Sequence, residues 1–344
     1  MSGPRPWLAA DGPDATALRV AGRSVARSEL AHRADALAGW LAAAGVEAGE
    51  TVAALLPNGL GFATLLHALD RCNAALLPLN LRLTPRELAF QLRDAGARRL
   101  FHDGGPLTTA AEEAAREAGG TAALALPDEP AAGAAPTRDT SLSAPLAILY
   151  TSGTTGAPKG AVLSHRAFLA SARASARHLG ASADDGWLAC LPLFHVGGLS
   201  ILLRGALHGC RVVVQPRFDA DAVSRALDAE AITHLSLVPT MLARLLETRG
   251  SAPAPPRLRC VLLGGGPAPK GLVERAARLG YPLAPATASP RRPPRWRRCA
   301  PGAAATRCAT GWSRSPARSC GSWRKTERRR RPARRGKSWC GARA

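Results

Sequence analysis

Aliphatic side chains are missing from the last part of this 344-residue sequence. Residues 286–344 contain no Leu, Ile, Val, Met, Phe or Tyr, although the chain as a whole is 46% hydrophobic. A segment without such side chains cannot bury enough apolar surface to offset the conformational entropy lost on folding. We therefore expect residues 286–344 to form no core of their own and to be disordered.

Acidic side chains are equally scarce in this tail. It holds 16 Arg and 2 Lys against a single Glu, so it carries +17 of the chain's net charge of +21. Residues 1–285 are left with +4, an ordinary surface charge. The composition therefore indicates a near-neutral part, long enough for two packed α/β units at ~150 residues each, followed by a basic tail.

Membrane spans, a secretory signal and paired cysteines are absent as well. No apolar run approaches the ~20 residues of a membrane helix, and the opening residues lack the charged-then-apolar pattern of a signal peptide. No CxxC pair occurs, and the tail cysteines fit no zinc spacing, so no residue is predicted to bind a metal. We expect a cytoplasmic chain, without membrane contact, whose single cysteines are buried thiols: Cys72, Cys190, Cys210 and Cys260.

Strand and helix patterns alternate through residues 1–285. Residues 27–45 carry apolar side chains at helical spacing, and residues 84–96 open with Thr-Pro, a common helix start. Residues 103–144, rich in Ala, Gly, Pro and Thr, predict one helix and a linker. Strands that are apolar throughout, between amphipathic helices, indicate parallel sheets covered on both faces. The predicted fold class is α/β, with a ligand site at the carboxyl ends of the strands.

A loop rich in glycine and hydroxyl groups follows the predicted strand 146–150. It runs from Thr151 to Gly160 and reads TSGTTGAPKG. Its glycines let backbone N–H groups turn toward an anion, its four hydroxyls can reach a phosphate or a phosphate-bound Mg²⁺, and Lys159 supplies a cation. It is not a Walker A loop, because Pro158 stands before the lysine. A surface turn would explain the glycines but not the hydroxyls and the lysine together, so the pattern favours a phosphate-binding loop.

The segment YTSGTTGAPKGAVLSH resembles the signature loop of the adenylate-forming acyl- and aryl-CoA synthetases. The resemblance covers about residues 20–285 and includes TVAALLPNG; in PLFHVGGLSILLRGALHG and LLGGGPAPK the sequence is most similar to the o-succinylbenzoate–CoA ligases of menaquinone synthesis. It implies two stacked βα subdomains with largely parallel sheets, the N-terminal domain of the adenylate-forming fold. It also implies that a carboxylic acid reacts with ATP, with Mg²⁺ present, and then with coenzyme A. A fatty or another aryl acid is the alternative substrate.

The same resemblance implies the site residues. Matching positions would hold the β- and γ-phosphates, with Thr155 and Lys159 also catalytic: Thr151, Ser152, Gly153, Thr154, Thr155, Gly156 and Lys159. His195 would lie beside the acyl carboxylate and the α-phosphate as a catalytic and substrate-binding residue, and a capping or core histidine is the alternative. Gly197 and Gly198 would admit the substrate close to the backbone. Gly264, Gly265 and Gly266 would form a wall for adenine and the acyl group, although a plain strand-to-helix turn also explains them.

The resemblance stops at Ala286. The family continues with an aromatic-Gly-x-Thr-Glu motif, whose Glu binds Mg²⁺, whereas this sequence continues TASPRRPPRWRR. Codons for YGLTEAASQVAT give that sequence when one T is deleted, and GKSWCGAR can be read in the same frame as GEI(V/L)VRGP, another family motif. Our hypothesis is that residues 286–344 are out-of-frame translation. The chain as written would then lack the metal-binding Glu and the C-terminal lid domain, and we expect it to have little or no ligase activity.

The basic tail also fits a different class of protein. Four consecutive arginines, Arg328–Arg331, and interspersed tryptophans would suit a nucleic-acid-binding protein. Charge alone would give binding that vanishes at moderate salt without sequence preference, so we expect no specific nucleic-acid partner. The sequence leaves open whether the chain forms a homo-oligomer.

Overall fold

The structure is a computed structural model that describes residues 7–8, 14–130, 136, 141–151, 158–289 and 292–296. For residues 287–289 and 292–296 it describes the backbone alone. Contacts divide the chain into two units, Met1–Ala309 and Thr310–Ala344. All described residues belong to the first unit.

The described residues form two β-sheets, the smaller of which has six strands in the order β6-β5-β3-β4-β7-β8. All neighbours in it are parallel except β7 and β8, which form an antiparallel hairpin. Its strands are β3 (Thr51–Leu55), β4 (Ala75–Pro78), β5 (Arg99–His102), β6 (Ala122–Ala125), β7 (Pro145–Thr151) and β8 (Lys159–Ser164). Strand β6 lies in the region predicted as one helix and a linker, which therefore also supplies an edge strand.

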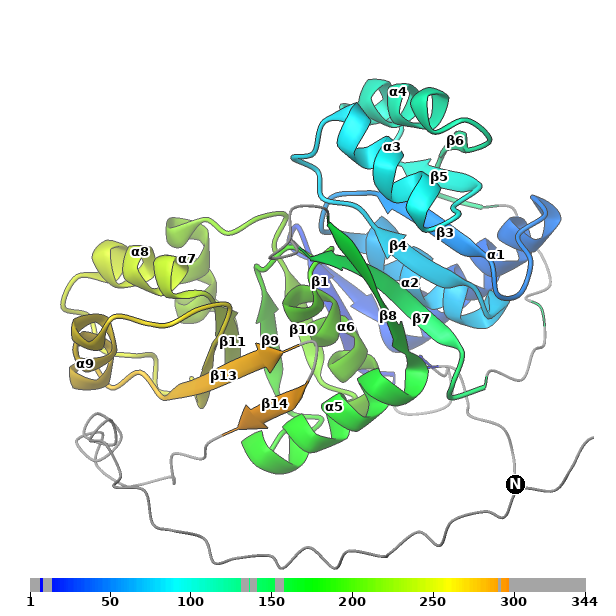
Figure 1. Cartoon of the computed structure of the whole chain (residues 1–344). Helices are drawn as coiled ribbons and strands as arrows, with labels where there is room; N and C mark the ends of the chain where they lie inside the picture. Colours follow the sequence, from blue (N-terminus) through cyan, green and yellow to red (C-terminus); the bar gives the residue numbers. More distant parts are fainter. Residues whose placement is uncertain are drawn as a thin grey trace, which may run out of the picture. The chain divides into compact units, whose positions relative to one another are not determined.

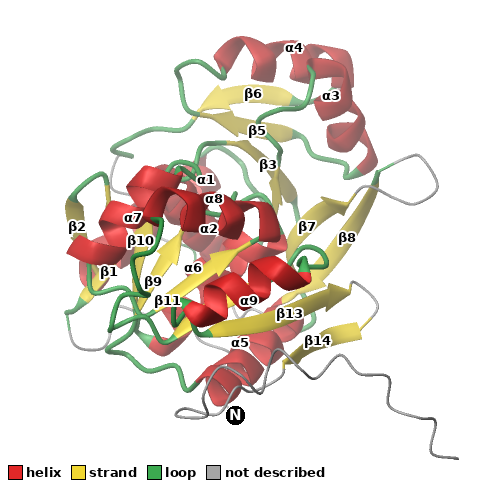
Figure 2. Ribbon diagram, turned by 90° about the vertical axis from the view of Figure 1, so that its left-hand side faces the viewer, coloured by secondary structure: helices red, strands yellow, loops and turns green. Residues whose placement is uncertain are grey.

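The larger sheet has eight strands in the order β14-β13-β12-β11-β9-β10-β1-β2 among the described residues. The outermost pairs, β1–β2 and β13–β14, are antiparallel and the pairs between them are parallel. Its strands are β1 (Thr16–Val20), β2 (Arg23–Ala26), β9 (Gly186–Ala189), β10 (Arg211–Val214), β11 (His234–Leu237), β12 (Cys260–Leu263), β13 (Leu283–Ser289) and β14 (Arg292–Trp296). Strands β13 and β14 lie side by side in Figure 2 and reach into the predicted basic tail; beyond Trp296 that tail lies outside the described residues.

Helices cover both sheets (Figure 1). In the part of the chain that the structure describes they are α1 (Arg27–Ala43), α2 (Leu60–Cys72), α3 (Pro85–Asp94), α4 (Thr108–Ala118), α5 (His165–Leu179), α6 (Val196–His208), α7 (Ala220–Ala229), α8 (Pro239–Arg249) and α9 (Lys270–Arg278). As the sequence predicts, α3 begins at the Thr-Pro pair. Thr84 and Glu87 form a reciprocal capping box there, in which the Thr84 N–H donates to Glu87 Oε2 at 2.8 Å.

Three buried cores show how the layers stack. One joins residues of α1, α2, α5 and α6 with strands of both sheets, so these helices lie between the sheets. A second packs α7, α8 and α9 on the outer face of the eight-stranded sheet, where they lie in front of it in Figure 2. A third packs α3 and α4 on the outer face of the six-stranded sheet. The prediction of an α/β fold with two stacked, largely parallel sheets is confirmed.

Strand β12 shows why the strands read as apolar throughout. Cys260 and Leu262 point into the core between the sheets, whereas Val261 and Leu263 point into the outer core. Successive side chains of a strand face opposite sides, so burial of both faces requires an unbroken apolar run. The other cysteines predicted to be buried, Cys72, Cys190 and Cys210, are buried too. No helix within the described residues is long and apolar enough to cross a membrane.

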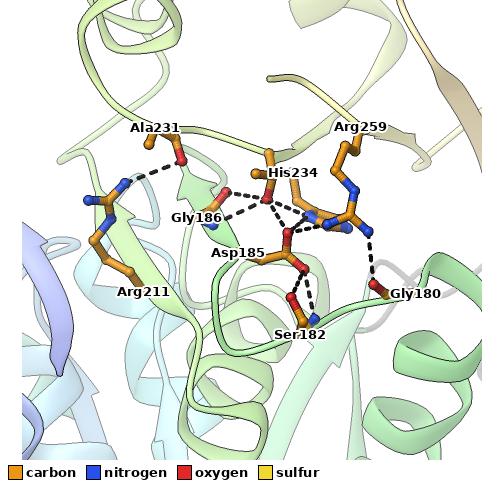
Figure 3. A network of polar contacts seen from close by, with 9 residues as sticks. Gly180, Ser182, Asp185, Gly186, Arg211, Ala231, His234 and Arg259 are labelled. Atoms are coloured by element: carbon orange, nitrogen blue, oxygen red, sulfur yellow. Dashed lines mark hydrogen bonds and ion pairs between the residues drawn. The ribbon is translucent and has the colours of Figure 1, made fainter. Parts of the chain in front are cut away.

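A buried polar network ties the amino ends of β9, β11 and β12 together (Figure 3). Asp185, the residue before β9, accepts hydrogen bonds from Thr233 Oγ1 at 2.8 Å, from Arg259 Nη1 at 2.7 Å and from the Ser182 N–H at 2.7 Å. His234 Nδ1 lies 2.8 Å from Thr233 Oγ1, and burial lowers the pKa of His234. Asp185 and Arg259 stand just before strands and His234 is the first residue of β11, so the network fixes the strand starts against one another.

Candidate functional site

The predicted phosphate loop is the turn of the β7–β8 hairpin. The last pair of the ladder before the turn is Thr151 with Lys159, and both residues are exposed. Lys159 forms no ion pair with any other described residue. An exposed ammonium group without an internal partner is available to an anion. The other predicted phosphate ligands lie outside the described residues: Ser152, Gly153, Thr154, Thr155 and Gly156.

Gly160, the last glycine of the loop, lies inside strand β8 and has a packing reason. A Cβ there would lie 3.1 Å from Ile148 Cγ2 and 3.2 Å from Tyr150 Cζ. The Tyr150 hydroxyl donates to Asp94 Oδ2 at 2.5 Å, and burial together with this carboxylate raises the pKa of Tyr150. Gly160 therefore makes room for a ring that fastens the hairpin to α3, and no anion is needed to explain it.

His195 lies at the amino end of α6, in the turn that follows β9. It occupies the N-cap position, but its side chain makes no capping hydrogen bond, and the residue is exposed. The two rings of Phe194 and His195 have centroids 4.5 Å apart. Partial loss of water around the imidazole lowers the pKa of His195, which favours the neutral ring. His195 is therefore the N-cap residue of α6 by position, but its side chain neither caps the helix nor lies in the core.

The two glycines after His195 differ in their surroundings. A Cβ at Gly198 would lie 2.3 Å from the Pro192 carbonyl oxygen, so the first turn of α6 packs directly on the preceding turn. At Gly197 the nearest atom to a Cβ would be Leu191 Cδ1 at 3.3 Å, and Gly197 is exposed. Backbone packing accounts for Gly198, whereas Gly197 lies on an open surface beside His195.

The triple glycine follows β12 and crosses the carboxyl end of the eight-stranded sheet. The Gly264 N–H donates to the Leu237 carbonyl at 3.0 Å, and a Cβ on Gly264 would lie 3.4 Å from the Ala286 carbonyl oxygen. Gly265 has a φ of +82°, and a Cβ there would lie 2.8 Å from Val238 Cγ1. Gly266 has nothing within 4 Å of the same position. Only the middle glycine is thus required by both backbone conformation and space.

A buried asparagine that the sequence analysis did not single out joins this site to the six-stranded sheet. Asn58 stands in the loop between β3 and α2, and it is 9% exposed. Its Nδ2 donates to the Leu191 carbonyl at 2.9 Å and to the Gln215 carbonyl at 3.1 Å, while its Oδ1 accepts from the Leu193 N–H at 2.9 Å. A polar residue directly after the apolar strand and Pro57 was the available signal.

These contacts decide which predicted residues come together. The turn bearing His195 meets the ends of β3 and β10 through Asn58, and the triple glycine meets the end of β11 through Gly264. No hydrogen bond or ion pair between described residues joins Lys159 to His195 or to the triple glycine. The described residues also contain no group of three His, Cys, Asp or Glu side chains that could hold a metal. Mg²⁺ commonly keeps several waters and takes only one or two carboxylates, so this finding does not bear on Mg²⁺.

Comparison with known proteins places this arrangement among nucleotide-using enzymes. The family described as AMP-binding enzyme matches residues 7–286. A 2-succinylbenzoate–CoA ligase from Bacillus cereus is 39% identical over 271 residues, which are 79% of this chain and 55% of that protein. The chain thus spans about half the length of the curated relatives it matches.

Solved structures show the same fold. The o-succinylbenzoate CoA synthetase of Bacillus subtilis with ATP and magnesium ion has 32% identity and a TM-score of 0.77, over 83% of this chain and 60% of that chain. The same enzyme with the acyl-adenylate intermediate OSB-AMP has 33% identity and a TM-score of 0.77, over 84% of this chain and 59% of that chain. ATP-bound MatB from Rhodopseudomonas palustris has 26% identity and a TM-score of 0.75, over 83% of this chain and 58% of that chain.

Proposed function

The chain belongs to the family of AMP-binding enzymes, and from this premise we propose that it carries the activating site of an acid–CoA ligase. In the first step a carboxylate oxygen bonds to the α-phosphorus of ATP, and the bond from that phosphorus to pyrophosphate breaks. In the second step the thiolate sulfur of coenzyme A bonds to the acyl carbon, the bond from that carbon to AMP breaks, and AMP leaves. The thiol proton passes to solvent.

The exposed Lys159 at the mouth of the β7–β8 hairpin is the observation that carries this proposal. It forms no ion pair with another described residue and stands at the end of a turn whose sequence is rich in glycines and hydroxyls, which suits the triphosphate of ATP. Phosphoryl transfer depends mainly on positioning and on neutralising oxygen charge. We assign the β- and γ-phosphates to the turn, with Thr155 and Lys159 nearest the reaction: Thr151, Ser152, Gly153, Thr154, Thr155, Gly156 and Lys159.

His195 and the triple glycine would receive the other end of the reactants. A neutral, exposed imidazole at the start of α6 can hydrogen-bond to the carboxylate or the α-phosphate without first losing a proton. Gly197 leaves the backbone beside it open. The turn of Gly264, Gly265 and Gly266 presents backbone without side chains, which suits the flat face of adenine and the acyl group.

We propose 2-succinylbenzoate as the acid. Support comes from the B. cereus ligase at 39% identity and from the B. subtilis synthetase bound to OSB-AMP at 33% identity. Other acyl or aryl acids are the alternative, since MatB shares the fold at 26% identity. The partners are therefore an organic acid, ATP with Mg²⁺, and coenzyme A, in the cytoplasm, where buried thiols stay reduced.

Calorimetric titration of the 344-residue protein with Mg·ATP tests the nucleotide site. Lys159→Ala should weaken binding about tenfold, because one charge-assisted contact to phosphate is worth ~1.5 kcal/mol. Lys270→Ala is the matched control, because Lys270 is also exposed but lies on α9 beside Glu274. Equal affinity of the Lys159 variant and the control would contradict the proposal.

We further propose that residues after 285 are translated out of frame. The family match ends at residue 286, and the aliphatic residues disappear at the same point. Adding one T there restores a reading of YGLTEAASQVAT. Restoring that base should raise pyrophosphate release with 2-succinylbenzoate, ATP and coenzyme A at least a hundredfold over the 344-residue protein. A gene sequence that reads through codon 286 without a missing base, or equal activity of both proteins, would overturn this.

A further inference from the structure

Asn58 is a buried side chain whose hydrogen bonds all leave its own sheet. It belongs to the loop after β3, in the six-stranded sheet, yet its three partners lie beyond the ends of β9 and β10 in the other sheet. Two are carbonyl groups and one is an N–H, so the amide uses both donors and its acceptor. The sequence distance to these partners is large, 133, 157 and 135 residues, so the contact is purely tertiary.

The partners of Asn58 are the residues that shape the turn before His195. Leu191 and Leu193 are held on either side of Pro192. The Pro192 carbonyl accepts the His195 N–H at 3.2 Å and occupies the space where Gly198 would carry a side chain. The backbone path from Asn58 to the imidazole is therefore short, and each step in it is a hydrogen bond or a close packing contact.

We infer that Asn58 is a positioning residue, which holds the turn of residues 191–193 so that the His195 ring stands where the acid and the α-phosphate meet. This inference rests on the proposed function for the role of His195. Loss of the amide would leave the two carbonyls and the N–H without their partner, and the turn would settle in another conformation. The imidazole would then move, although it never touches Asn58.

Nuclear magnetic resonance of the whole 344-residue protein with labelled histidine rings tests this directly. Asn58→Ala should shift the His195 ring signal by more than its line width and leave the signals of buried, remote histidines in place. His195→Gln identifies the signal. Asn80→Ala is the matched control, because among the described residues Asn80 Oδ1 accepts a local hydrogen bond alone, from the N–H of Arg82 two residues on. A merely stabilising role for Asn58 would not move a native-state signal recorded far below the unfolding transition.

A second variant keeps the test decisive if Asn58→Ala does not fold. Asn58→Asp preserves the size and the acceptor for Leu193 but sets a carboxylate against two carbonyl oxygens, so it too should shift the His195 signal. An unchanged signal in either folded variant would overturn the inference.

The nucleotide titration separates this inference from the proposed function. Asn58→Ala should weaken binding of a non-hydrolysable acyl-adenylate analogue at least fivefold more than binding of Mg·ATP, because only the analogue reaches the acid side of the site. If the unsubstituted protein bound neither ligand while the Asn58 variants still shifted the His195 signal, the proposed function would be contradicted. The contact from Asn58 to the turn before His195 would still be supported. If the unsubstituted protein bound nucleotide but the Asn58 variants left the His195 signal unchanged, only the positioning role of Asn58 would be overturned.

Discussion

The strands of the eight-stranded sheet differ at their two ends in how polar groups are partnered. We call the amino ends the amino edge and the carboxyl ends the open edge. At the amino ends of the strands, Asp185 is buried and its carboxylate accepts four hydrogen bonds, from Ser182, Thr233 and Arg259. At the carboxyl ends, His195 is exposed and its ring has no hydrogen bond from the described residues, and glycines replace side chains beside it. The Asp185 carboxylate thus has its partners within the described residues, whereas the His195 ring at the other ends has none among them. The proposed binding site would thus lie at the opposite ends of the same strands from this network.

The largest loss of unfolding free energy is expected at the amino edge. Asp185→Ala removes the buried acceptor of Thr233, of Ser182 and of the half-exposed Arg259, and the lost hydrogen bonds to a carboxylate are together worth roughly 3–5 kcal/mol. Urea unfolding followed by circular dichroism should show this loss of unfolding free energy. Asp184→Ala, at the exposed neighbouring position, should change it by less than about 0.5 kcal/mol. A loss below about 1 kcal/mol for Asp185→Ala would show that the network does not hold the strands.

A smaller effect is expected within the triple glycine at the open edge. Gly265→Ala forces a side chain into the left-handed region and 2.8 Å from Val238 Cγ1, which should cost roughly 2–4 kcal/mol and weaken Mg·ATP binding. Gly266→Ala meets nothing within 4 Å and should leave both nearly unchanged. Urea unfolding and calorimetry on the two variants make the comparison. Equal behaviour of the two would mean that the glycines are interchangeable.

The sequence predicted the stacked α/β fold because burial of both strand faces leaves unbroken apolar runs, as at Val261 and Leu262. It could not predict β6, because a short run of alanine and leucine is equally typical of a linker. It marked Lys159 through the glycines and hydroxyls of its loop, whereas only the resemblance to the family marked His195. It gave no role to Asn58, whose partners lie more than 130 residues away along the chain. Contacts between sheets leave no periodic trace in a sequence.

Lowering the pH should change the unfolding free energy through the buried titratable groups. Burial lowers the pKa of His234, so below its usual value of 6.5 the unfolded chain binds a proton that the folded chain refuses, and stability falls as the pH falls. His67, with a pKa lowered to about 3 by burial, acts in the same direction. Asp70, with a pKa raised to about 6 by burial, acts in the opposite direction, since its folded form retains a proton that the unfolded chain loses between 3.8 and 6.

His234→Gln should therefore reduce the loss of unfolding free energy between pH 7 and pH 5 by about 1–2 kcal/mol. His195→Gln, at the open edge, should reduce that loss by less, because its exposed ring loses only part of its water and the lowering of its pKa is smaller than that of His234. Urea unfolding at the two pH values measures both variants. If the two substitutions changed the pH dependence equally, burial at the amino edge would not be its source.

The smallest effect is expected from an ion pair at the open side of the sheet. Lys270 and Glu274 on α9 lie 3.6 Å apart, with side chains 80% and 38% exposed, whereas the Asp185 side chain in its pair with Arg259 is fully buried. Water and salt screen exposed pairs, so Lys270→Ala should lower the unfolding free energy by only about 0.3 kcal/mol. Its urea midpoint should match that of the unsubstituted protein within error and stay insensitive to added salt. A loss above about 1 kcal/mol would mean that charge pairing itself, rather than burial, makes the amino edge the stable one.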